Sequence, residues 1–535
     1  MAHKTNIGGT AYNIVGGKSL VSGTAYSIKK GRTLVNGTGY NINFISEVIA
    51  MLYSTGDFAF QRGDEVESGK TLVNSYTGFE DNSYSSVSSV PWNAQRASIK
   101  NVYCNEEVAP SNMVYWFDNC MNLVSFNITN FNMNNVTNMA YTYRNCYNLT
   151  GSPICGDNVT NMYHAYRNCY NLTGSPICGN KVTSMASTYR NCYNLTGSPV
   201  CGNNVTNMTY TYADCSNLTG SPVCGNNVTN MTYAYDNCSN LTGSPVCGNN
   251  VTSMTSTYAD CINLTGSPVC GNNVVDMGYA YANCSNLTGS PVCGNNVTSM
   301  TYTYRNCYNL TGSPVCGNKV TSMINTYQNC YNLTGFPVCG DNVTGMAYTY
   351  RNCYNLTGSP ICGNKVTSMA STYEGCYNLT GSPICGNNVT SMASTYRNCY
   401  NLTGSPVCGN KVTSMASTYR NCYNLTGSPI CGNNVTNMAY TYQNCSNLSG
   451  NAYFYSSTIG NASNCFGLKN NSKQLNIYVP NGSKTQTTVL YSNTRSLVGT
   501  TITWTNAGTY HYNTTYNIYI YPVENVAAAR AANSD

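Results

Sequence analysis

A pattern of 23 residues recurs without an insertion from Cys146 to Cys445. The first copy reads Cys146-Tyr-Asn-Leu-Thr-Gly-Ser-Pro-Ile-Cys155-Gly-Asp-Asn-Val-Thr-Asn-Met-Tyr-His-Ala-Tyr-Arg-Asn168, and Cys169 begins the next. Repeats of about 20 to 50 residues are typical of solenoids, in which a small unit stacks on its neighbours around a continuous core. One copy would bury about four or five apolar side chains at roughly 1.5–3 kcal/mol each, while ordering its backbone costs about 1–2 kcal/mol per residue. A single coil therefore cannot fold alone, and the pattern predicts a stack.

Comparison of the copies separates buried from exposed positions, because a column that never changes is expected to be buried. The unchanging positions are those of Cys146, Leu149, Ile154 (Ile or Val), Val159, Met162 and Tyr166. Residues 149–154 are predicted as one short strand, 159–162 as a second, and 165–169 as a short helical or 3₁₀ turn. We therefore expect a β-rich solenoid with coils of 23 residues, flanked by β-rich N- and C-terminal domains.

These residues resemble a known repeat. The order Leu-Thr-x-x-x-Ile/Val-x-x-x-x-Val-Thr-x-Met/Ile-x-x-Tyr-x-Tyr/Phe-x-x-Cys-x-x-Leu is similar to the BspA-like leucine-rich repeat, and residues 112–131 resemble its bacterial surface-lipoprotein variant. Two positions depart from that family: Ser152 stands where an aliphatic residue is usual, and Cys155 where Pro is frequent. The resemblance implies extracellular adhesion and recognition, with no catalysis and no cofactor.

Four segments are expected along the chain. Residues 1–44 carry a shorter repeat of 14 residues with Gly9, Gly23 and Gly37 at its boundaries, which predicts a small β-meander. This segment resembles the N-terminal segments of structural proteins in phages of Gram-positive gut bacteria. Under that resemblance it attaches the chain to other virion proteins or to sister chains in a homo-oligomer. The alternative is a β cap for the solenoid.

The other three segments are a connector, the solenoid and a C-terminal cap. Residues 45–98 are predicted as an irregular β connector, and 99–450 as the solenoid, beginning with an atypical first coil over 99–120. Residues 451–535 are rich in Tyr, Thr and Ile up to 523 and are predicted as a β-rich cap that ends in a loose tail over 527–535.

Composition narrows the classes of partner. Only 8% of the 535 residues are charged and the net charge is +6, which does not favour nucleic-acid binding. No run approaches the roughly 18 apolar residues of a membrane span, and the opening Met-Ala-His-Lys-Thr lacks the pattern of a secretion signal. This conflicts with a surface adhesin exported by its own cell and suits a virion component released by lysis. We expect a virion or extracellular location.

The 30 cysteines allow three interpretations. Most of them form two columns, one through Cys146 and one through Cys155, whose spacing does not fit a zinc site. Neighbouring coils would place column members about 4.8 Å apart, within the Cα range for a disulfide. The Cys146 column is expected to be buried thiol that packs as a small apolar group; a disulfide ladder and a metal site are the alternatives.

Catalytic patterns are not apparent. The three histidines, His3, His164 and His511, stand in no metal or triad motif, and acids are sparse within the repeats. The Asn-x-Thr triplets match glycosylation acceptors, but a structural role in turns and side-chain ladders is preferred. We expect a protein that is not an enzyme.

Contact residues are expected where the copies differ. The position two residues after each Met varies, and its aromatic members include Tyr141, Tyr210 and Tyr233. The residue after the first Cys is a tyrosine in the early copies, at Tyr147, Tyr170 and Tyr193. The column two residues before that Cys carries Arg144, Arg167 and Arg190. Regular Tyr and Arg are typical of contact surfaces; the alternative is a solvated edge.

Three functions remain open. The first is a phage structural protein, such as a fibre, spike or decoration protein, that binds host-surface or mucus glycan or protein. The second is a bacterial surface adhesin of the BspA-like type. The third, suggested by stacked Thr columns, is a protein that binds an ice or crystal face. The Arg column predicts salt-sensitive binding of an anionic glycan by the first third of the solenoid.

Overall fold

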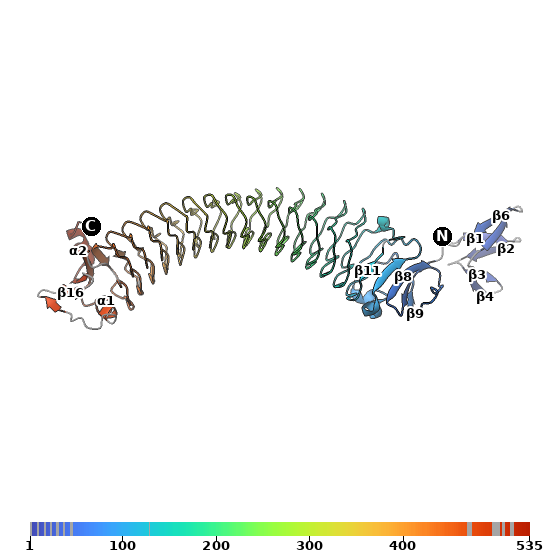
Figure 1. Ribbon diagram of the computed structural model, residues 1–535, viewed down its shortest axis with the longest axis horizontal. Helices are drawn as coiled ribbons and strands as arrows, with labels where there is room; N and C mark the ends of the chain where they lie inside the picture. The colour runs from blue at the N-terminus through green and yellow to red at the C-terminus, as the bar shows by residue number, and fades with distance from the viewer. Residues whose placement is uncertain are drawn as a thin grey trace. The chain divides into compact units, whose positions relative to one another are not determined.

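The computed structural model describes residues 3–7, 10–14, 18–21, 24–27, 31–35, 38–42, 47–127, 129–467, 473–494, 503–505, 509–513 and 518–534. Side chains are described over 47–127, 129–467, 473–489 and 518–534. The chain divides into two compact units, Met1–Thr173 with Gly179–Val182, and Gly174–Cys178 with Thr183–Asp535. Each unit is described by itself. Figure 1 shows the coils of the second unit as loops that lie side by side.

The N-terminal segment forms three antiparallel hairpins, each a separate two-stranded sheet. The hairpins are β1 (His3–Ile7) with β2 (Thr10–Ile14), β3 (Lys18–Val21) with β4 (Thr24–Ser27), and β5 (Gly31–Val35) with β6 (Thr38–Ile42). Two-residue connections favour such hairpins. The predicted continuous meander is therefore replaced by three separate pairs, and the boundary residues Gly9, Gly23 and Gly37 lie outside the described residues.

A five-stranded sheet joins the predicted connector to the first coil. Its order is β11-β10-β8-β7-β9, formed by β7 (Val48–Tyr53), β8 (Asp57–Arg62), β9 (Leu72–Tyr76), β10 (Asn101–Cys104) and β11 (Ser125–Phe126). Three 3₁₀ segments accompany it, η1 (Val87–Ser89), η2 (Asn93–Ser98) and η3 (Met133–Asn135). Because β10 pairs in parallel with β8, the sheet continues directly into the coil stack. Phe58, Phe60, Trp92, Trp116 and Phe117 fill the core beneath it, fully buried.

Arg96 closes the exposed end of the first coil. In the segment after each buried Met, carbonyl groups accept hydrogen bonds from the coil before them, as Ala234 does from Tyr212 N–H, and the first coil has no such neighbour. The Arg96 guanidinium, 5% exposed, donates to the carbonyls of Tyr115 at 2.9 Å and of Asp118. Trp92 Nε1 donates to the carbonyl of Trp116 at 2.6 Å. Buried carbonyls that would lose water on folding thus obtain partners from side chains.

The coils are built from turns. In the segment that follows each buried Met, alternate N–H groups bond within the coil and along the stack: Tyr212 N–H donates to the carbonyl of Ala234 at 2.8 Å, while Ala213 N–H donates to that of Tyr210 at 3.3 Å. Tyr210 and Asp214 adopt positive φ, 55° and 64°. These left-handed residues prevent helix continuation. The predicted helical or 3₁₀ turn is therefore wrong, and the segment is a run of tight turns.

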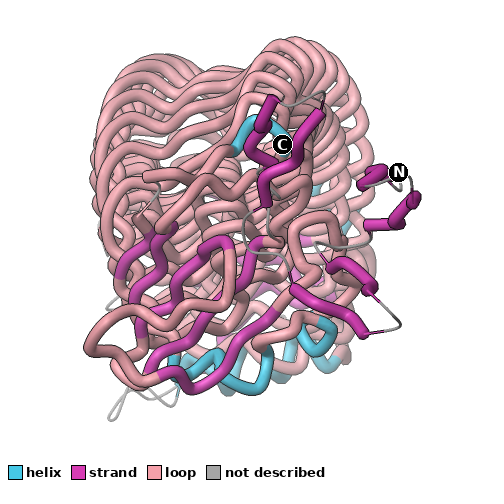
Figure 2. The backbone as a smooth tube through the Cα atoms, turned by 90° about the vertical axis from the view of Figure 1, so that its right-hand side faces the viewer, coloured by secondary structure: helices cyan, strands magenta, loops and turns pink. Residues whose placement is uncertain are grey.

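The two predicted strands of each coil are reduced to isolated parallel bridges. One bridge joins equivalent residues of neighbouring coils, as in Asn207 with Asn230 and Ser299 with Ser322. Figure 2 accordingly draws the coil backbones as loops. Turn residues interrupt the coil, since Gly220 has a φ of 81° and its Cβ position would lie 2.3 Å from the Ser198 hydroxyl of the preceding coil. The coarser prediction of a β-rich repeat fold with few helices is confirmed.

The core of the stack consists of the unchanging columns. Leu218, Val228, Met231, Tyr235 and Cys238 are all fully buried, and the same holds at the equivalent positions of the other coils. The inner tyrosine ladder comprises Tyr143, Tyr166, Tyr189, Tyr212, Tyr235, Tyr258, Tyr281, Tyr304, Tyr327, Tyr350, Tyr373, Tyr396, Tyr419 and Tyr442. In the second unit its rings stack with centroids 5.4–5.6 Å apart. The predicted buried set is confirmed for the columns of Cys146, Leu149, Val159, Met162 and Tyr166. It is wrong for the Ile/Val column of Ile154, whose members Ile384 and Val407 are 43% and 40% exposed.

A six-stranded sheet ends the second unit, in the order β12-β13-β14-β17-β16-β15. Its elements are β12 (Ile430–Cys431), β13 (Gly450–Phe454), β14 (Leu475–Pro480), β15 (Thr503–Thr505), β16 (Thr509–Asn513) and β17 (Ile518–Val523), with helices α1 (Lys484–Thr494) and α2 (Val526–Ala532). The tail predicted to be loose instead forms α2. Asn525 caps this helix by accepting from Ala528 N–H, and alanines favour helix strongly.

Candidate tyrosine and arginine surface

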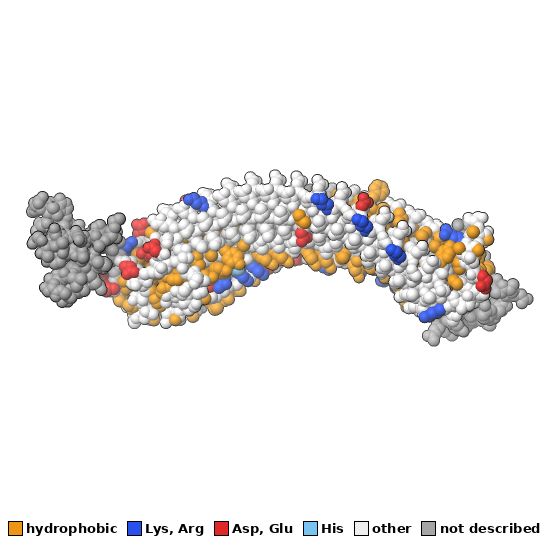
Figure 3. All heavy atoms as spheres, turned by 180° about the vertical axis from the view of Figure 1, so that it is seen from behind, with side chains coloured by type: hydrophobic (Ala, Val, Ile, Leu, Met, Phe, Trp, Pro, Cys, Tyr) orange, Lys and Arg blue, Asp and Glu red, His pale blue; other side chains and the backbone are white. Residues whose placement is uncertain are grey.

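The surface of the coils is mostly uncharged. Figure 3 shows few Lys, Arg, Asp or Glu side chains on the face in view, and hydrophobic side chains, a class that includes tyrosine, gathered along one edge of the coils. Exposed tyrosines include Tyr193, Tyr279, Tyr308, Tyr348 and Tyr423, which are 37–42% exposed. These rings, together with more isolated apolar side chains such as Phe336, are large side chains that a partner of the coils can reach.

Arg144 is held by an acid that the sequence interpretation left out. Its Nε lies 2.8 Å from Oδ1 of Asp118 and its Nη2 lies 2.7 Å from Oδ2, so the pair is bidentate. Asp118 is fully buried, and its hydrogen bonds raise the pKa of Arg144. The guanidinium also lies 4.7 Å from the ring centroid of Tyr141. Arg144 therefore offers a partner much less charge than an unpaired arginine would.

The other predicted residues divide between the two units. In the first, Arg167 lies 3.2 Å from Nδ1 of His164. In the second, the Arg190 guanidinium lies 4.5 Å from the ring centroid of Tyr210, and that ring stacks on Tyr233 at 4.6 Å. The rings that Arg144 and Arg190 cover belong to the column of Tyr141, and not to the column of Tyr147. The structure therefore brings arginines together with the first tyrosine column.

The second tyrosine column stacks on itself. Tyr147 and Tyr170 have ring centroids 4.9 Å apart and planes 6° apart. Further along, six consecutive copies extend this column into what we call the outer tyrosine stack: Tyr308, Tyr331, Tyr354, Tyr377, Tyr400 and Tyr423. Its unbroken run of Tyr after the first Cys was visible in the sequence, although only the early copies were proposed as contact residues.

Stacking limits which parts of these tyrosine rings a ligand can contact. Centroid distances of 4.7–5.2 Å in the outer tyrosine stack leave no room for another ring between neighbours. A sugar that stacks on a ring face can therefore use only the two ends of the stack, while the other rings present edges and hydroxyls. Equivalent edges follow from coil to coil, so the surface suits an extended partner better than a compact one.

Acids interrupt the arginine column. Glu374 lies between two arginines, with its carboxylate 3.1 Å from Arg351 Nε and 3.6 Å from Arg397 Nη1. Asp236 occupies the same column, and burial, together with Asp214 and Asp260, raises its pKa to about 7. Acidic and neutral residues thus interrupt the column, and it is not a continuous cationic stripe.

The thiols of the first cysteine column donate to backbone. Cys238 Sγ lies 3.1 Å from the carbonyl of Tyr212, and Cys307 Sγ lies 3.0 Å from that of Tyr281. The second column is half-buried, and burial raises the pKa of Cys247 to about 11. No disulfide joins any of the 30 cysteines, all of which lie among the described residues. Raised thiol pKa values oppose metal binding and oxidation alike.

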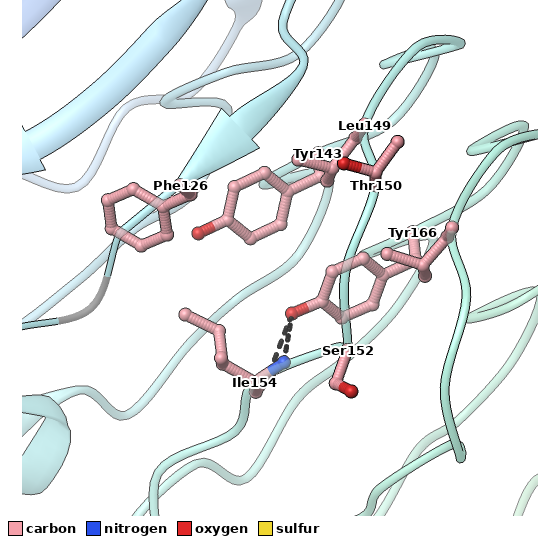
Figure 4. Close-up of a pocket in the computed structure, with 8 residues that line it drawn as sticks. Phe126, Tyr143, Leu149, Thr150, Ser152, Ile154 and Tyr166 are labelled. Carbon is pink, nitrogen blue, oxygen red and sulfur yellow. Dashed lines mark hydrogen bonds between the residues drawn. The ribbon is translucent and has the colours of Figure 1, made fainter.

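A small cavity lies beside the first ring of the inner tyrosine ladder. Phe126, Tyr143, Ile154 and Tyr166 line about 20 Å³, enough for one water molecule. Figure 4 shows the Tyr166 hydroxyl bonded to the Ile154 backbone, where it donates to the carbonyl at 2.7 Å and accepts from N–H at 2.9 Å. The buried Tyr143 hydroxyl has no protein partner among the described residues. The cavity is too small for an organic ligand.

The described part of the chain offers little for metal binding, membrane insertion or a free threonine surface. Within it, no three His, Cys, Asp or Glu side chains are placed to hold a metal ion. Its helices are all too short or too polar to cross a bilayer. Exposed Thr side chains direct their hydroxyls to backbone, as Thr206 Oγ1 does to the Thr183 carbonyl at 3.2 Å. His3 and His511 fall outside the residues whose side chains the structure describes.

Parallel bridges between equivalent residues and a buried leucine in each coil decide the repeat type. The repeat region is a leucine-rich-repeat-like solenoid. The predicted leucine-rich-repeat type is thereby confirmed at this coarser level, and residues 111–221 match a family model described as "Mycoplasma protein of unknown function, DUF285". That match contains the early coils and covers well under half of the 535 residues.

Two solved structures are similar to the chain. A leucine-rich cell surface protein from Faecalibacterium prausnitzii is 13% identical, with 71% of this chain and 92% of that chain covered and a TM-score of 0.30. A leucine-rich repeat protein from Bacteroides ovatus is also 13% identical, with 82% and 94% covered and a TM-score of 0.31. No curated protein matches the sequence. Such low TM-scores carry no argument, so the fold assignment depends on the coil geometry.

Proposed function

We propose that the chain is a non-enzymatic structural and adhesion protein whose solenoid surface binds an extended anionic glycan of a host cell or mucus layer. The observation that carries the proposal is the repetition of Tyr–Arg pairs along the coils. Arg190 with Tyr210, Arg305 with Tyr302 and Arg420 with Tyr440 each place a guanidinium 4.5–5.5 Å from a ring centroid. Pre-stacked guanidinium groups lose little side-chain entropy when they bind sulfate, carboxylate or phosphate groups.

The paired arginines of the second unit replace Arg144 as the first choice for mutation. Substituting Arg144 would leave buried Asp118 without its bidentate partner and destabilise the fold. The column itself tolerates glutamine, which stands at Gln328 and Gln443. A triple variant of Arg190, Arg305 and Arg420 to Gln is therefore expected to fold like the parent.

A matched control removes three positive charges elsewhere. Lys319, Lys365 and Lys411 occupy another column, and each donates to an asparagine Oδ1 of the preceding coil at 2.6–2.7 Å. Asparagine is the usual residue of that column, so Lys→Asn at the three positions preserves the coil. Both triple variants change the net charge equally.

The experiment measures binding to immobilised acidic mucin and to teichoic acid over a series of salt concentrations. We expect salt-sensitive binding by the parent and by the Lys variant, and at least roughly tenfold weaker binding by the Arg variant. If both variants bind equally weakly, the loss of binding follows from net charge and the Tyr–Arg pairs have no special role. Unchanged binding by the Arg variant would end the proposal.

The setting that we propose is a virion, with a bacterial cell surface as the alternative. The support is the tandem of hairpins β1–β2, β3–β4 and β5–β6, because a two-stranded hairpin is only marginally stable alone in water. Pairing with sister chains or with other virion proteins would stabilise all three. Light scattering of the full chain should give a homo-oligomer mass, and a monomer mass at micromolar concentration would contradict attachment through sister chains.

A further inference from the structure

The outer tyrosine stack holds partly exposed phenol rings of neighbouring coils close together and nearly parallel. Five successive ring pairs from Tyr308 to Tyr423 lie at centroid distances of 4.9, 4.8, 4.7, 4.8 and 5.2 Å. Their planes are 1–19° apart. The end rings Tyr308 and Tyr423 are 38% and 42% exposed, and the four between them are half-buried. Each ring edge, with its hydroxyl and ortho carbons, therefore reaches solvent beside the same edge of the next coil.

We propose that the outer tyrosine stack is a site of oxidative cross-linking, at which tyrosines of neighbouring coils couple to dityrosine. The co-reactants are hydrogen peroxide and a peroxidase, which removes one electron and one proton from each of two phenols. The two tyrosyl radicals form one carbon–carbon bond between ortho carbons, and the two ortho hydrogens then move to the ring oxygens. Two tyrosines and one hydrogen peroxide thus give one dityrosine and two water molecules.

Proximity favours coupling within the stack over coupling between molecules. A radical on Tyr354 has Tyr331 at 4.8 Å on one side and Tyr377 at 4.7 Å on the other. Groups held this close react as if present at very high local concentration. The ring edges face solvent, so rotation about the side-chain bonds can bring two ortho carbons into contact without disturbing the buried core.

The inner tyrosine ladder provides a contrast within the same coils. Its rings lie at similar distances, 5.5 Å for Tyr304 and Tyr327, but they are fully buried. The Tyr304 hydroxyl donates to the Val292 carbonyl at 2.7 Å, and burial raises the pKa of Tyr304 well above its usual value. Proton loss is therefore opposed, and a peroxidase cannot approach. Oxidation should be confined to the outer stack and to other exposed tyrosine pairs.

Such links would act on the weakest feature of a solenoid. Each coil contacts only its neighbours, so an opened coil can propagate separation along the stack. A bond between adjacent coils would join residues 23 positions apart and hold both coils together after local opening. This inference depends on the geometry of the stack alone, and it stands independently of the proposed glycan binding.

The test compares two triple variants that each lose three tyrosines. The alternating variant replaces Tyr331, Tyr377 and Tyr423 with Ser, so no two remaining rings of the stack are neighbours. The consecutive variant replaces Tyr377, Tyr400 and Tyr423 with Ser and keeps the neighbours Tyr308, Tyr331 and Tyr354. Serine occupies this column naturally at Ser216, Ser239 and Ser285, so both variants are compatible with the coil. Circular dichroism checks their folding.

The full-length proteins are treated at low concentration with hydrogen peroxide and a peroxidase, digested with trypsin and analysed by mass spectrometry. Lys or Arg separates the six tyrosines into different tryptic peptides, but the peptides of Tyr308 and Tyr400 have the same sequence and others contain additional tyrosines. Fragmentation of each linked pair locates the coupled tyrosines, and the consecutive variant, which lacks Tyr400, assigns the links of Tyr308. We expect linked neighbours in the parent and in the consecutive variant, and at least roughly tenfold fewer outer-stack links in the alternating variant. The proposal is overturned by equal yields in the two variants, by links that form only between molecules, or by absence of outer-stack links in the parent.

Discussion

Removing one buried hydroxyl tests how the coils are held together. In Tyr304→Phe the ring remains, while the hydroxyl that donates to the Val292 carbonyl at 2.7 Å and accepts from its N–H at 3.0 Å is lost. The partly buried N–H and carbonyl of Val292 then lose this partner, each at a cost in the lower part of the roughly 1–3 kcal/mol of a fully buried group. We therefore expect the free energy of unfolding to fall by about 2–4 kcal/mol.

Tyr143→Phe is the matched control. It deletes the same atom from the same kind of buried ring, but the Tyr143 hydroxyl has no protein partner in the described part of the chain. The substitution removes an unpaired polar group and leaves no backbone group unpaired, so the expected loss is at most about 1 kcal/mol. The difference between the two variants isolates the backbone hydrogen bonds from the packing of the ring.

The assay combines urea unfolding followed by far-ultraviolet circular dichroism with hydrogen exchange of the native proteins. Exchange is needed because repeat arrays can open locally without global unfolding. In Tyr304→Phe the Val292 amide should lose protection, and in Tyr143→Phe it should be unchanged. Equal destabilisation by the two substitutions, or unchanged exchange at Val292 in Tyr304→Phe, would refute the reasoning.

Three further outcomes are expected. Because burial raises the pKa of Asp236 to about 7 from an ordinary value of 3.8, its contribution to stability is greatest below pH 3.8 and declines as the pH rises toward 7. Asp236→Asn should remove that decline, as urea unfolding at pH 5 and pH 8 will show, whereas equal pH dependence in the variant would contradict the assignment. Arg96→Met should cost about 1–3 kcal/mol, because the Asp118 carbonyl loses its side-chain donor while the Tyr115 carbonyl keeps the Asp118 N–H, and an unchanged urea midpoint would count against a capping role. Alkylation of the denatured protein without reductant should add close to 30 groups. In the folded protein, alkylation should be confined to the cysteines of the second column, most of which are half-buried. A mass that reveals a dozen or more disulfides would favour the disulfide ladder instead.

The geometry of the proposed contact surface was only partly predictable. The sequence located Tyr and Arg columns, because they drift between copies while core columns do not. It did not pair Arg144 with Asp118, since these residues belong to different coils and 26 positions separate them. Nor did it distinguish rings with available faces from rings that cover one another, because that depends on the distance between coils.

Local backbone conformation was the main error in the fold. Ala-Tyr-Arg-Asn is compatible with a helical turn, but the structure places residues such as Tyr210 and Asp214 at positive φ. What decides this is the neighbouring coil, whose carbonyls accept the alternate N–H groups and stabilise turns that would be strained in isolation. The α2 helix was missed because a helix of seven residues is too short to be stable alone. Packing on the cap stabilises it, since Val526 is buried and the Arg530 guanidinium lies 6.0 Å from the ring centroid of Tyr453.

The sequence by itself determined the repeat, the buried columns and the absence of a self-sufficient coil. These follow from periodicity and from the balance between apolar burial and backbone entropy, which are properties of the chain. Only the tertiary structure decided that the buried tyrosine hydroxyls bond to the backbone and that the outer rings stack on one another. Tyr304 and Tyr308 stand four residues apart in one coil, yet one donates inside the core and the other faces solvent. The physical reason is that each tyrosine's environment is supplied by the adjacent coils, and their distance and direction exist only once the stack has formed.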